Sequence, residues 1–123
     1  MKSVRRRVLV VDDNADAAET LAMILELNGH EVRTASSGPM ALELAQALQP
    51  EVVFLDIGLP GMNGYEVAQH LRAHPGHGPM VLVALTGWGR DQDKDLAKEA
   101  GFDHHLTKPM DVEAVETILS KLP

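Results

Sequence analysis

The sequence predicts an α/β fold in which helices cover both faces of one five-stranded parallel sheet. Short apolar runs alternate along the 123 residues with segments whose apolar residues recur at helical spacing. The apolar runs are continuous, which is typical of parallel strands that are buried on both faces. Because crossovers between parallel strands are almost always right-handed, only a few topologies fit this alternation.

The first strand and helix have clear boundaries. Val8–Val11 is a run of branched apolar residues, and we expect the helix after it to cover about 14–28 and to stop at Gly29. Its predicted core residues are Ala18, Leu21, Ala22 and Leu25.

The middle of the chain repeats this arrangement. Glu31–Ala35 is predicted to be the second strand, and the helix after it begins at Ser37, a good capping residue, and ends at Pro50. The third strand is Val52–Leu55. The glycine-rich segment Gly58–Gly64 is expected to form a loop.

The last part of the chain completes five strand and helix pairs. We expect a helix over Tyr65–Ala73, a strand over Met80–Leu85, a polar helix over Asp91–Ala100 and a strand over His104–Thr107. The final helix is capped by Asp111. Its predicted core residues are Val112, Val115, Ile118, Leu119 and Leu122.

Length and composition indicate one ordinary globular domain. The mass is 13.3 kDa, with 45% hydrophobic and 24% charged residues, and domains usually have about 100–200 residues. We therefore expect residues 1–123 to form a single domain that begins with a basic segment, 1–7.

Charge and cysteine content exclude several classes of protein. The net charge is −7, although Lys2, Arg5, Arg6 and Arg7 all lie in the basic N-terminal segment. The remaining chain is strongly acidic and is not expected to bind nucleic acid. The absence of cysteine excludes disulfides and zinc–thiolate sites. No apolar run approaches the ~18 residues of a membrane span, and no targeting segment is recognised, so we expect a cytoplasmic location.

Four predicted strands end in residues that can do chemistry. Asp12 and Asp13 follow the first strand, Asp56 the third, Thr86 the fourth and Lys108 the fifth. The carboxyl ends of parallel strands lie along one edge of the sheet, where ligands bind in open α/β folds. We therefore expect these residues to converge although they are far apart in the sequence.

The converging residues suit phosphoryl transfer. Three carboxylates in one pocket repel one another unless cations intervene, and Lys108 offsets one negative charge. Oxygen ligands such as Asp12, Asp13, Asp56 and a loop carbonyl are those that Mg²⁺ prefers. With a metal ion, a lysine and a hydroxyl nearby, one aspartate can act as a nucleophile toward phosphorus.

Together, these motifs resemble the receiver domain of two-component response regulators. The motifs are Val10-Val11-Asp12-Asp13-Asn14, Asp56 followed by Leu59-Pro60-Gly61-Met62-Asn63-Gly64, Leu85-Thr86-Gly87, and Lys108-Pro109. Their order and spacing match over essentially the whole chain. The resemblance implies a single-domain, doubly wound, CheY-like (flavodoxin-like) (βα)5 fold with strand order 2-1-3-4-5.

The resemblance also implies a role for each site residue. Asp56 would accept a phosphoryl group from a phosphohistidine of a histidine kinase or histidine phosphotransfer protein, and phosphorylation would switch a protein-interaction surface. Mg²⁺ would be held by Asp12, Asp13, Asp56 and the backbone carbonyl of Gly58.

The remaining motif residues would act on the phosphoryl group and its loop. Lys108 would pair with the carboxylate and then with the phosphoryl group, and Thr86, followed by Gly87, would hydrogen-bond a phosphoryl oxygen. A cis peptide is expected between Lys108 and Pro109. Such a domain catalyses only its own phosphorylation and dephosphorylation, so it is not expected to be an enzyme that acts on a metabolite.

Three positions affect how the receiver would work. The switch position on the fifth strand, usually Tyr or Phe in the family, is His105, whose imidazole can titrate. Trp88, two residues after Thr86, and Gly58, two residues after Asp56, occupy positions that tune hydrolysis of the acyl phosphate in the family.

Other readings of the same residues remain. The segments Leu85–Gly89, Ala100–Asp103 and His105–Leu106 are similar to receivers fused to sensor histidine kinases, so the chain fits both a stand-alone receiver and a module of a hybrid kinase. The alternatives in function are a pseudo-receiver that only binds partners and a Mg²⁺-dependent phosphatase with an aspartyl-phosphate intermediate. In dehalogenase-type phosphatases the nucleophile follows the first strand and a second Asp lies two residues on, where this chain has Gly58.

Overall fold

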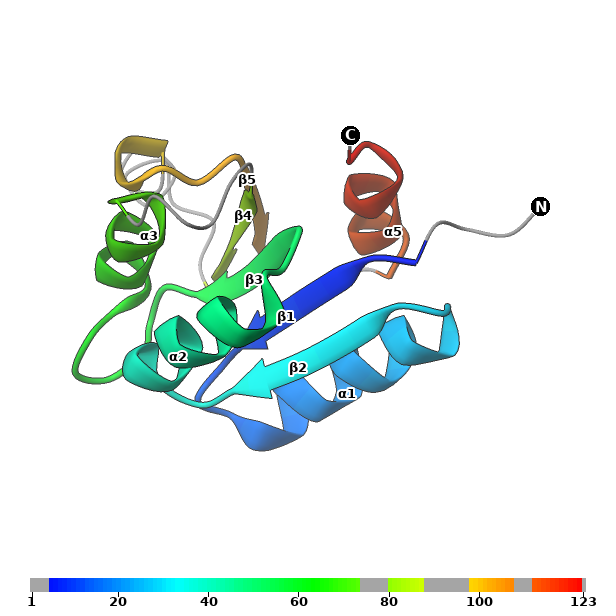
Figure 1. The fold of residues 1–123 in the computed structure, drawn as a ribbon, viewed down its shortest axis with the longest axis horizontal. Coiled ribbons are helices and arrows are strands. Elements are labelled where there is room, and N and C mark those ends of the chain that lie inside the picture. Colours follow the sequence, from blue (N-terminus) through cyan, green and yellow to red (C-terminus); the bar gives the residue numbers. More distant parts are fainter. Residues whose placement is uncertain (1–4, 74–79, 88–97, 108–111, 123) are drawn as a thin grey trace.

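The fold is a twisted five-stranded parallel sheet with helices on both faces (Figure 1). The computed structural model describes residues 5–73, 80–87, 98–107 and 112–122. The strands are β1 (Arg7–Val11), β2 (Glu31–Ala35), β3 (Val52–Asp56), β4 (Val81–Thr86) and β5 (His104–Thr107). They are all paired in parallel in the order β2-β1-β3-β4-β5, which confirms the predicted fold and strand order.

The described helices also fall where the sequence predicts them. They are α1 (Ala15–Leu27), α2 (Gly38–Leu48), α3 (Gly64–Ala73) and α5 (Val112–Ser120). Residues 98–100 are helical too. They form the end of the predicted helix Asp91–Ala100, of which residues 91–97 lie outside the described residues.

Local capping explains where α1 and α2 begin and end. The side chains of Asn14 and Ser37 accept hydrogen bonds from backbone N–H groups in the first turns of α1 and α2, at 3.1 and 3.3 Å. Beyond α1, Gly29 has φ +95°, a left-handed conformation that glycine adopts without strain. Gln49 takes the same conformation at φ 53° and ends α2 just before Pro50.

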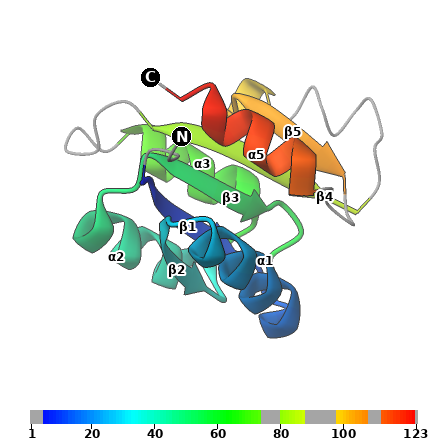
Figure 2. The same ribbon diagram turned by 90° about the vertical axis from the view of Figure 1, so that its right-hand side faces the viewer.

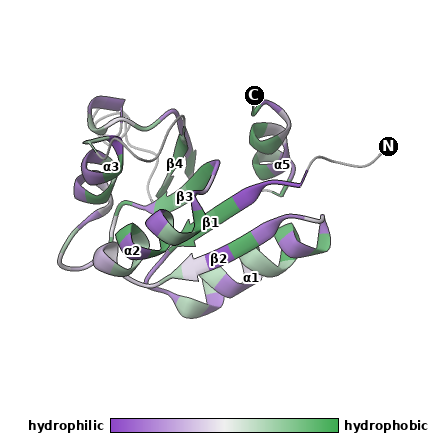
Figure 3. Cartoon of the chain, in the orientation of Figure 1, coloured by the Kyte–Doolittle hydropathy of each residue, from purple (hydrophilic) through white to green (hydrophobic). Residues whose placement is uncertain are grey.

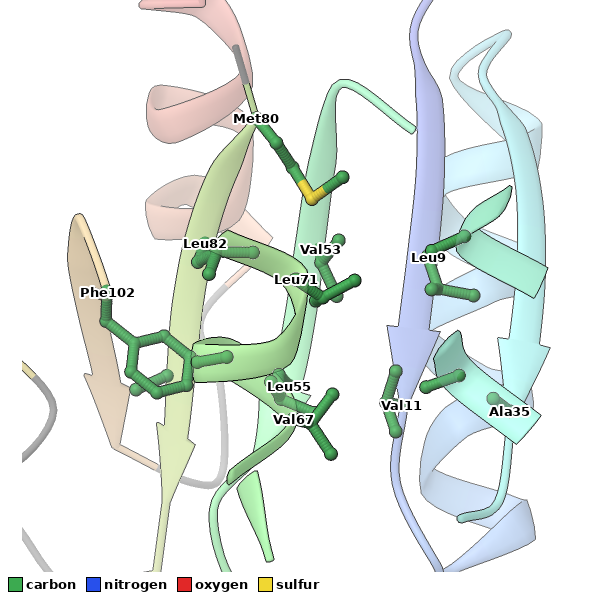
Figure 4. Close-up of a cluster of buried hydrophobic side chains, with 14 of the residues drawn as sticks. Leu9, Val11, Ala35, Val53, Leu55, Val67, Leu71, Met80, Leu82 and Phe102 are labelled. Carbon is green, nitrogen blue, oxygen red and sulfur yellow. The ribbon is translucent and has the colours of Figure 1, made fainter. Parts of the chain in front are cut away.

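Two apolar layers hold the helices on the sheet. α1 and α5 cover one face, and α2 and α3 cover the other, as the turned view in Figure 2 shows. Figure 3 shows that the central strands β1 and β3 are largely hydrophobic. Figure 4 shows the cluster beneath α2 and α3, which includes Leu9, Val11, Ala35, Val53, Leu55, Val67, Leu71, Met80, Leu82 and Phe102.

One predicted core residue is at the surface. Val112 is 41% exposed, whereas the other four predicted core residues of the last helix are buried. Val112 is the first residue of α5, and it lines an open groove beside α1 instead of the core. The prediction that it belongs to the core was therefore wrong.

Two large apolar side chains on α1 face solvent. Met23 is 61% exposed and Leu27 is 81% exposed, while the four residues predicted to form the buried face of this helix are all in the core. None of the described helices is long and apolar enough to cross a membrane.

Candidate functional site

Three aspartates form an acidic cluster at the carboxyl edge of the sheet. Asp56 is the last residue of β3, and Asp12 and Asp13 directly follow β1, the strand beside it. One carboxylate oxygen of each residue lies within 4.8 Å of those of the other two. Asp12 and Asp56 are buried and Asp13 is exposed, so the cluster is partly open to solvent.

Backbone contacts fix the position of Asp56. Its Oδ1 accepts a hydrogen bond from the N–H of Gly58 at 2.8 Å, which sets the rotation of the carboxylate. The next residue, Ile57, still donates to the carbonyl of Leu85 on β4 at 3.2 Å. The ladder of the sheet therefore continues past Asp56, and this is why Asp56 belongs to the strand itself.

The first residue of α3 lies directly against this segment. A Cβ atom on Gly64 would lie 2.5 Å from the Cα of Ile57 and 2.6 Å from the carbonyl oxygen of Asp56. Only glycine permits this approach. Asn63 and Glu66 then cap α3 reciprocally, since the side chain of each accepts the backbone N–H of the other, at 3.0 and 3.4 Å.

Asp12 is held at the start of α1. Its N–H donates to the carbonyl of Ala35 on β2 at 3.0 Å, and its Oδ1 accepts the N–H of Asn14 at 3.0 Å. Because Asn14 also caps α1, the side-chain orientation of Asp12 is tied to the beginning of that helix. The positive end of the helix dipole lies beside the acidic cluster and favours negative charge there.

Thr86 lies on the strand next to Asp56. It ends β4, where it is 1% exposed, and β4 pairs with β3 so that Asp56 is opposite Leu85. The Thr86 hydroxyl Oγ1 is 3.0 Å from Nε2 of His105 on β5. The sequence predicted Thr86 at this edge and His105 on the fifth strand, but it did not show that their side chains would lie within hydrogen-bond distance.

An open groove of about 560 Å³ runs from the acidic cluster between α1 and α5. Asp12, Asn14 and Gly87 line its end at the site. Its walls are mostly apolar and include Ala17, Leu21, Ile24, Val112 and Val115. A partner that fills this groove would contact Asp12, one of the three clustered aspartates.

The structure therefore brings together Asp12, Asp13 and Asp56, and places Thr86 and Gly87 beside them. Lys108, Pro109 and Trp88 lie outside the described residues, so their predicted roles and the predicted cis peptide stay predictions. So does the role of the Gly58 carbonyl as a metal ligand. Sequence reasoning did not single out Gly64 or the Asn63 and Glu66 cap. The Asn-x-x-Glu spacing before an apolar helix was the signal for that cap.

The donor set suits a hard cation. Three carboxylates this close repel one another, and a divalent ion with oxygen ligands removes that repulsion. A carboxylate held at a strand end, a cation site beside it and a hydroxyl on the next strand are the parts of a phosphoryl-transfer site.

Comparisons with known proteins agree with this arrangement. The family described as "Response regulator receiver domain" matches residues 8–120. The DNA-binding response regulator MtrA of Mycobacterium tuberculosis is 39% identical over 109 residues, which are 89% of this chain and 46% of MtrA. The chain thus spans about half the length of the first curated relatives it matches.

Solved structures give the same result. The chemotaxis protein CheY4 of Vibrio cholerae superposes with a TM-score of 0.90 at 28% identity, covering 98% of this chain and all of CheY4. The receiver domain of Ssk1 from Saccharomyces cerevisiae, solved with the histidine phosphotransfer protein Ypd1, gives a TM-score of 0.87 at 25% identity over 96% of this chain and 88% of that one. From the family match over residues 8–120 and the identity to response regulators, we conclude that this chain belongs to the response regulator receiver domain family.

Proposed function

We propose that this receiver domain accepts a phosphoryl group on Asp56 in a two-component phosphorelay. The observation that supports this most strongly is the cluster of Asp12, Asp13 and Asp56 within 4.8 Å at the carboxyl edge of the sheet. Asp56 lies between the other two carboxylates and the strand that ends in Thr86, and the Gly58 N–H orients it.

In the proposed reaction, a carboxylate oxygen of Asp56 attacks the phosphorus of a phosphohistidine on the partner. An O–P bond forms as the P–N bond breaks, and the electron pair of the broken bond returns to the histidine nitrogen. The product is an acyl phosphate on Asp56. Attack by water on that phosphorus regenerates the carboxylate, so the domain returns to its starting state without a further enzyme.

The cluster fits Mg²⁺. Its carboxylates are hard oxygen ligands, and they are close enough together to need a cation. We propose that Asp12, Asp13, Asp56 and the carbonyl of Gly58 hold the ion. When bound, Mg²⁺ would supply positive charge to the carboxylates and to the phosphoryl oxygens.

We assign the other motif residues as follows. Thr86 donates its hydroxyl proton to a phosphoryl oxygen, and Gly87 leaves room beside it, since a Cβ there would contact nothing within 4 Å. Lys108 supplies a second positive charge, and the peptide bond between Lys108 and Pro109 is proposed to be cis. Trp88 shields the phosphoryl group from water, whereas Gly58 leaves space for water.

The partner is expected to dock on α1. Met23 and Leu27 are exposed on this helix, and the groove between α1 and α5 leads to the acidic cluster. The structural neighbour Ssk1 was solved with a histidine phosphotransfer protein. We propose a partner of that class, or a histidine kinase, whose apolar helical surface covers Met23 while its phosphohistidine reaches Asp56.

Phosphorylation would then shift the domain between two conformations that differ in the surface around β5 and α5. The target of that surface is a separate protein or a fused domain, and several curated relatives are DNA-binding response regulators. We expect the domain to act in the cytoplasm and to catalyse only its own phosphorylation and dephosphorylation.

Intact mass measurement tests this function. The wild type, Asp56→Asn and Asp16→Asn are incubated with a small-molecule phosphodonor, with and without Mg²⁺. One Mg²⁺-dependent phosphoryl group is expected on the wild type and on Asp16→Asn, whose carboxylate is exposed on the first turn of α1. None is expected on Asp56→Asn. An adduct that forms equally on Asp56→Asn would contradict the assignment of the acceptor.

Beryllium fluoride, which mimics a phosphoryl group, separates the alternatives. Trp88 is the only tryptophan and lies two residues after Thr86, so its fluorescence reports on this site. Binding that requires both Mg²⁺ and Asp56 supports a receiver. A domain that neither binds beryllium fluoride nor gains a phosphoryl group would be a pseudo-receiver.

A further inference from the structure

The contact between Thr86 and His105 joins a predicted phosphoryl ligand to a titratable group. Oγ1 of Thr86 and Nε2 of His105 are 3.0 Å apart. Thr86 is almost completely buried, and His105 is partly buried. His105 is paired with Ala84, two residues before Thr86, so both side chains project from the same face of the sheet.

This hydrogen bond can run in either direction, and the direction decides what the hydroxyl can do. A threonine hydroxyl has one proton to donate. When Nε2 is unprotonated, the hydroxyl donates that proton to the imidazole and has none for another acceptor. When Nε2 carries a proton, the imidazole donates to Oγ1, and the hydroxyl proton is available elsewhere.

We propose that His105 is a positioning residue that controls, through its own protonation, whether the Thr86 hydroxyl can donate to a phosphoryl group on Asp56. The inference rests on the proposed function, in which Thr86 contacts that phosphoryl group. An imidazolium carries protons on both nitrogens, so only the donating arrangement remains. Protonation of His105 and phosphorylation of Asp56 therefore favour each other.

The coupling is reciprocal. If protonated His105 strengthens phosphoryl binding, then phosphoryl binding raises the pKa of His105 by the matching amount. Histidine ordinarily titrates near pH 6.5, within the range of intracellular pH changes. A tyrosine or phenylalanine at this position would not change its charge in that range.

Other charged groups near this face of the sheet are already engaged or exposed. Asp103, two residues before His105, pairs with Arg72 of α3, and Glu66 of α3 caps its own helix. Further titratable or charged side chains on the described elements of this face and its edge include Asp56, Glu43, Tyr65, His70, Lys98 and Glu99, and His104 is the neighbour of His105 on β5. Because some of these titrate or bear charge, the test compares variants at two adjacent histidines.

The test measures beryllium fluoride affinity in saturating Mg²⁺ between pH 7.5 and 5.5. The samples are the wild type, His105→Gln and His104→Gln. Glutamine keeps a donor and an acceptor but does not titrate, and His104 is the exposed neighbour on the same strand. The wild type and His104→Gln are expected to bind more tightly at pH 5.5 than at pH 7.5, by about fivefold if binding raises a histidine pKa of 6.5 by one unit.

In His105→Gln this dependence on pH is expected to disappear. Equal pH dependence in all three proteins would overturn the inference. If the wild type fails to bind at every pH, the proposed function fails instead, so the two failures are distinct.

A second measurement uses the unmodified protein, so it does not depend on whether a variant folds. The imidazole resonance of His105 is titrated by NMR with and without Mg²⁺ and beryllium fluoride, and sequential assignment of the same protein identifies the signal. The pKa of His105 is expected to rise in the complex. An unchanged or lowered pKa would overturn the proposal.

Discussion

The guanidinium of Arg72 at the end of α3 lies 2.6 Å from the carboxylate of Asp103, which precedes β5. The same side chain donates to the carbonyl of Gly101 at 3.0 and 2.8 Å and to that of Met80 at 2.5 Å. Asp103 in turn accepts the N–H of Leu82 at 2.9 Å. Arg72 and Asp103 thus join α3 to the beginnings of β4 and β5.

Replacing Arg72 with lysine should destabilise the fold by about 1–2 kcal/mol. A lysine ammonium cannot form the fork that contacts two carbonyls and a carboxylate at once, and each lost hydrogen bond costs about 0.5–1.5 kcal/mol, reduced here by partial exposure. Urea unfolding measures the change. Arg33→Lys, on the exposed side of β2, is the control and should change stability very little. A double-mutant cycle with Asp103→Asn that shows no coupling would contradict this account.

A methyl group at Gly64 should disturb the phosphoacceptor segment. The added Cβ would meet the backbone of Asp56 and Ile57 at about 2.5 Å, and backbone cannot move aside as a flexible side chain can. We expect Gly64→Ala to cost about 1–3 kcal/mol and to slow phosphorylation. Gly87→Ala is the matched control for stability, because its Cβ would contact nothing within 4 Å. Equal stability of the two variants would show that the segment relaxes freely.

Much of this fold could be predicted because burial leaves a periodic signal in the sequence. The apolar runs of β1, β3 and β4 are buried almost throughout, so their continuity marked them as central parallel strands. Parallel strands place their carboxyl ends together, and this brought Asp12 next to Asp56 although no local pattern relates them.

Contacts between single side chains leave no such signal. The hydrogen bond between Thr86 and His105 depends on the register of β5, and the hydrogen bond from Arg72 to Asp103 depends on where a loop turns. The close approach of Gly64 to Asp56 depends on the path of the loop between them. Val112 was wrongly placed in the core because helical periodicity identifies a face, and not how far along the helix that face stays covered.

The stability of the domain should depend on pH through Glu51 at the start of β3. Burial by itself raises the pKa of this carboxylate, but hydrogen bonds from the Arg6 side chain and the Arg7 backbone, with both positive charges, bring it below its usual 4.5. Arg6 Nη1 is 2.9 Å from Glu51 Oε2. A group with a lowered folded pKa stabilises the protein above its unfolded pKa, and this contribution is lost as the pH falls through the folded pKa.

We therefore expect Glu51→Gln to lower stability by about 1 kcal/mol at pH 7 and by much less at pH 3. The measurement is urea unfolding at both values. Glu31→Gln, whose contact with Arg5 is 3.9 Å and more exposed, should cost less at pH 7. A loss for Glu51→Gln that is the same at both pH values would show that its charge is not responsible.

Because the clustered aspartates repel one another, Asp13→Asn should change the melting temperature in opposite directions with and without Mg²⁺. Without divalent ions, Asp13→Asn should raise the melting temperature, because it removes one of three charges within 4.8 Å of one another. With saturating Mg²⁺, the wild type should become the more stable protein, since it binds the ion more tightly. Asp16→Asn controls for the change of a nearby carboxylate. The same order of melting temperatures in both conditions would contradict a cation site.

A charged substitution on α1 should slow phosphoryl transfer from a partner protein without changing phosphorylation by a small donor. Met23 is 61% exposed on the helix that borders the groove, so Met23→Glu should place a carboxylate in the apolar contact with a phosphotransfer protein. Transfer from a partner's phosphohistidine is expected to slow by at least about tenfold, which corresponds to about 1.4 kcal/mol. Phosphorylation by a small donor should stay unchanged, because Asp56 and the residues around it are intact.

Gln69→Glu is the matched control for this prediction. Gln69 is exposed on α3, which covers the opposite face of the sheet from α1, so the same added charge lies off the proposed docking surface. If both variants slow transfer from the partner equally, the effect comes from net charge and not from a contact on α1. If Met23→Glu also slows the small donor, the helix has shifted the acidic cluster through Asn14, which joins the start of α1 to Asp12.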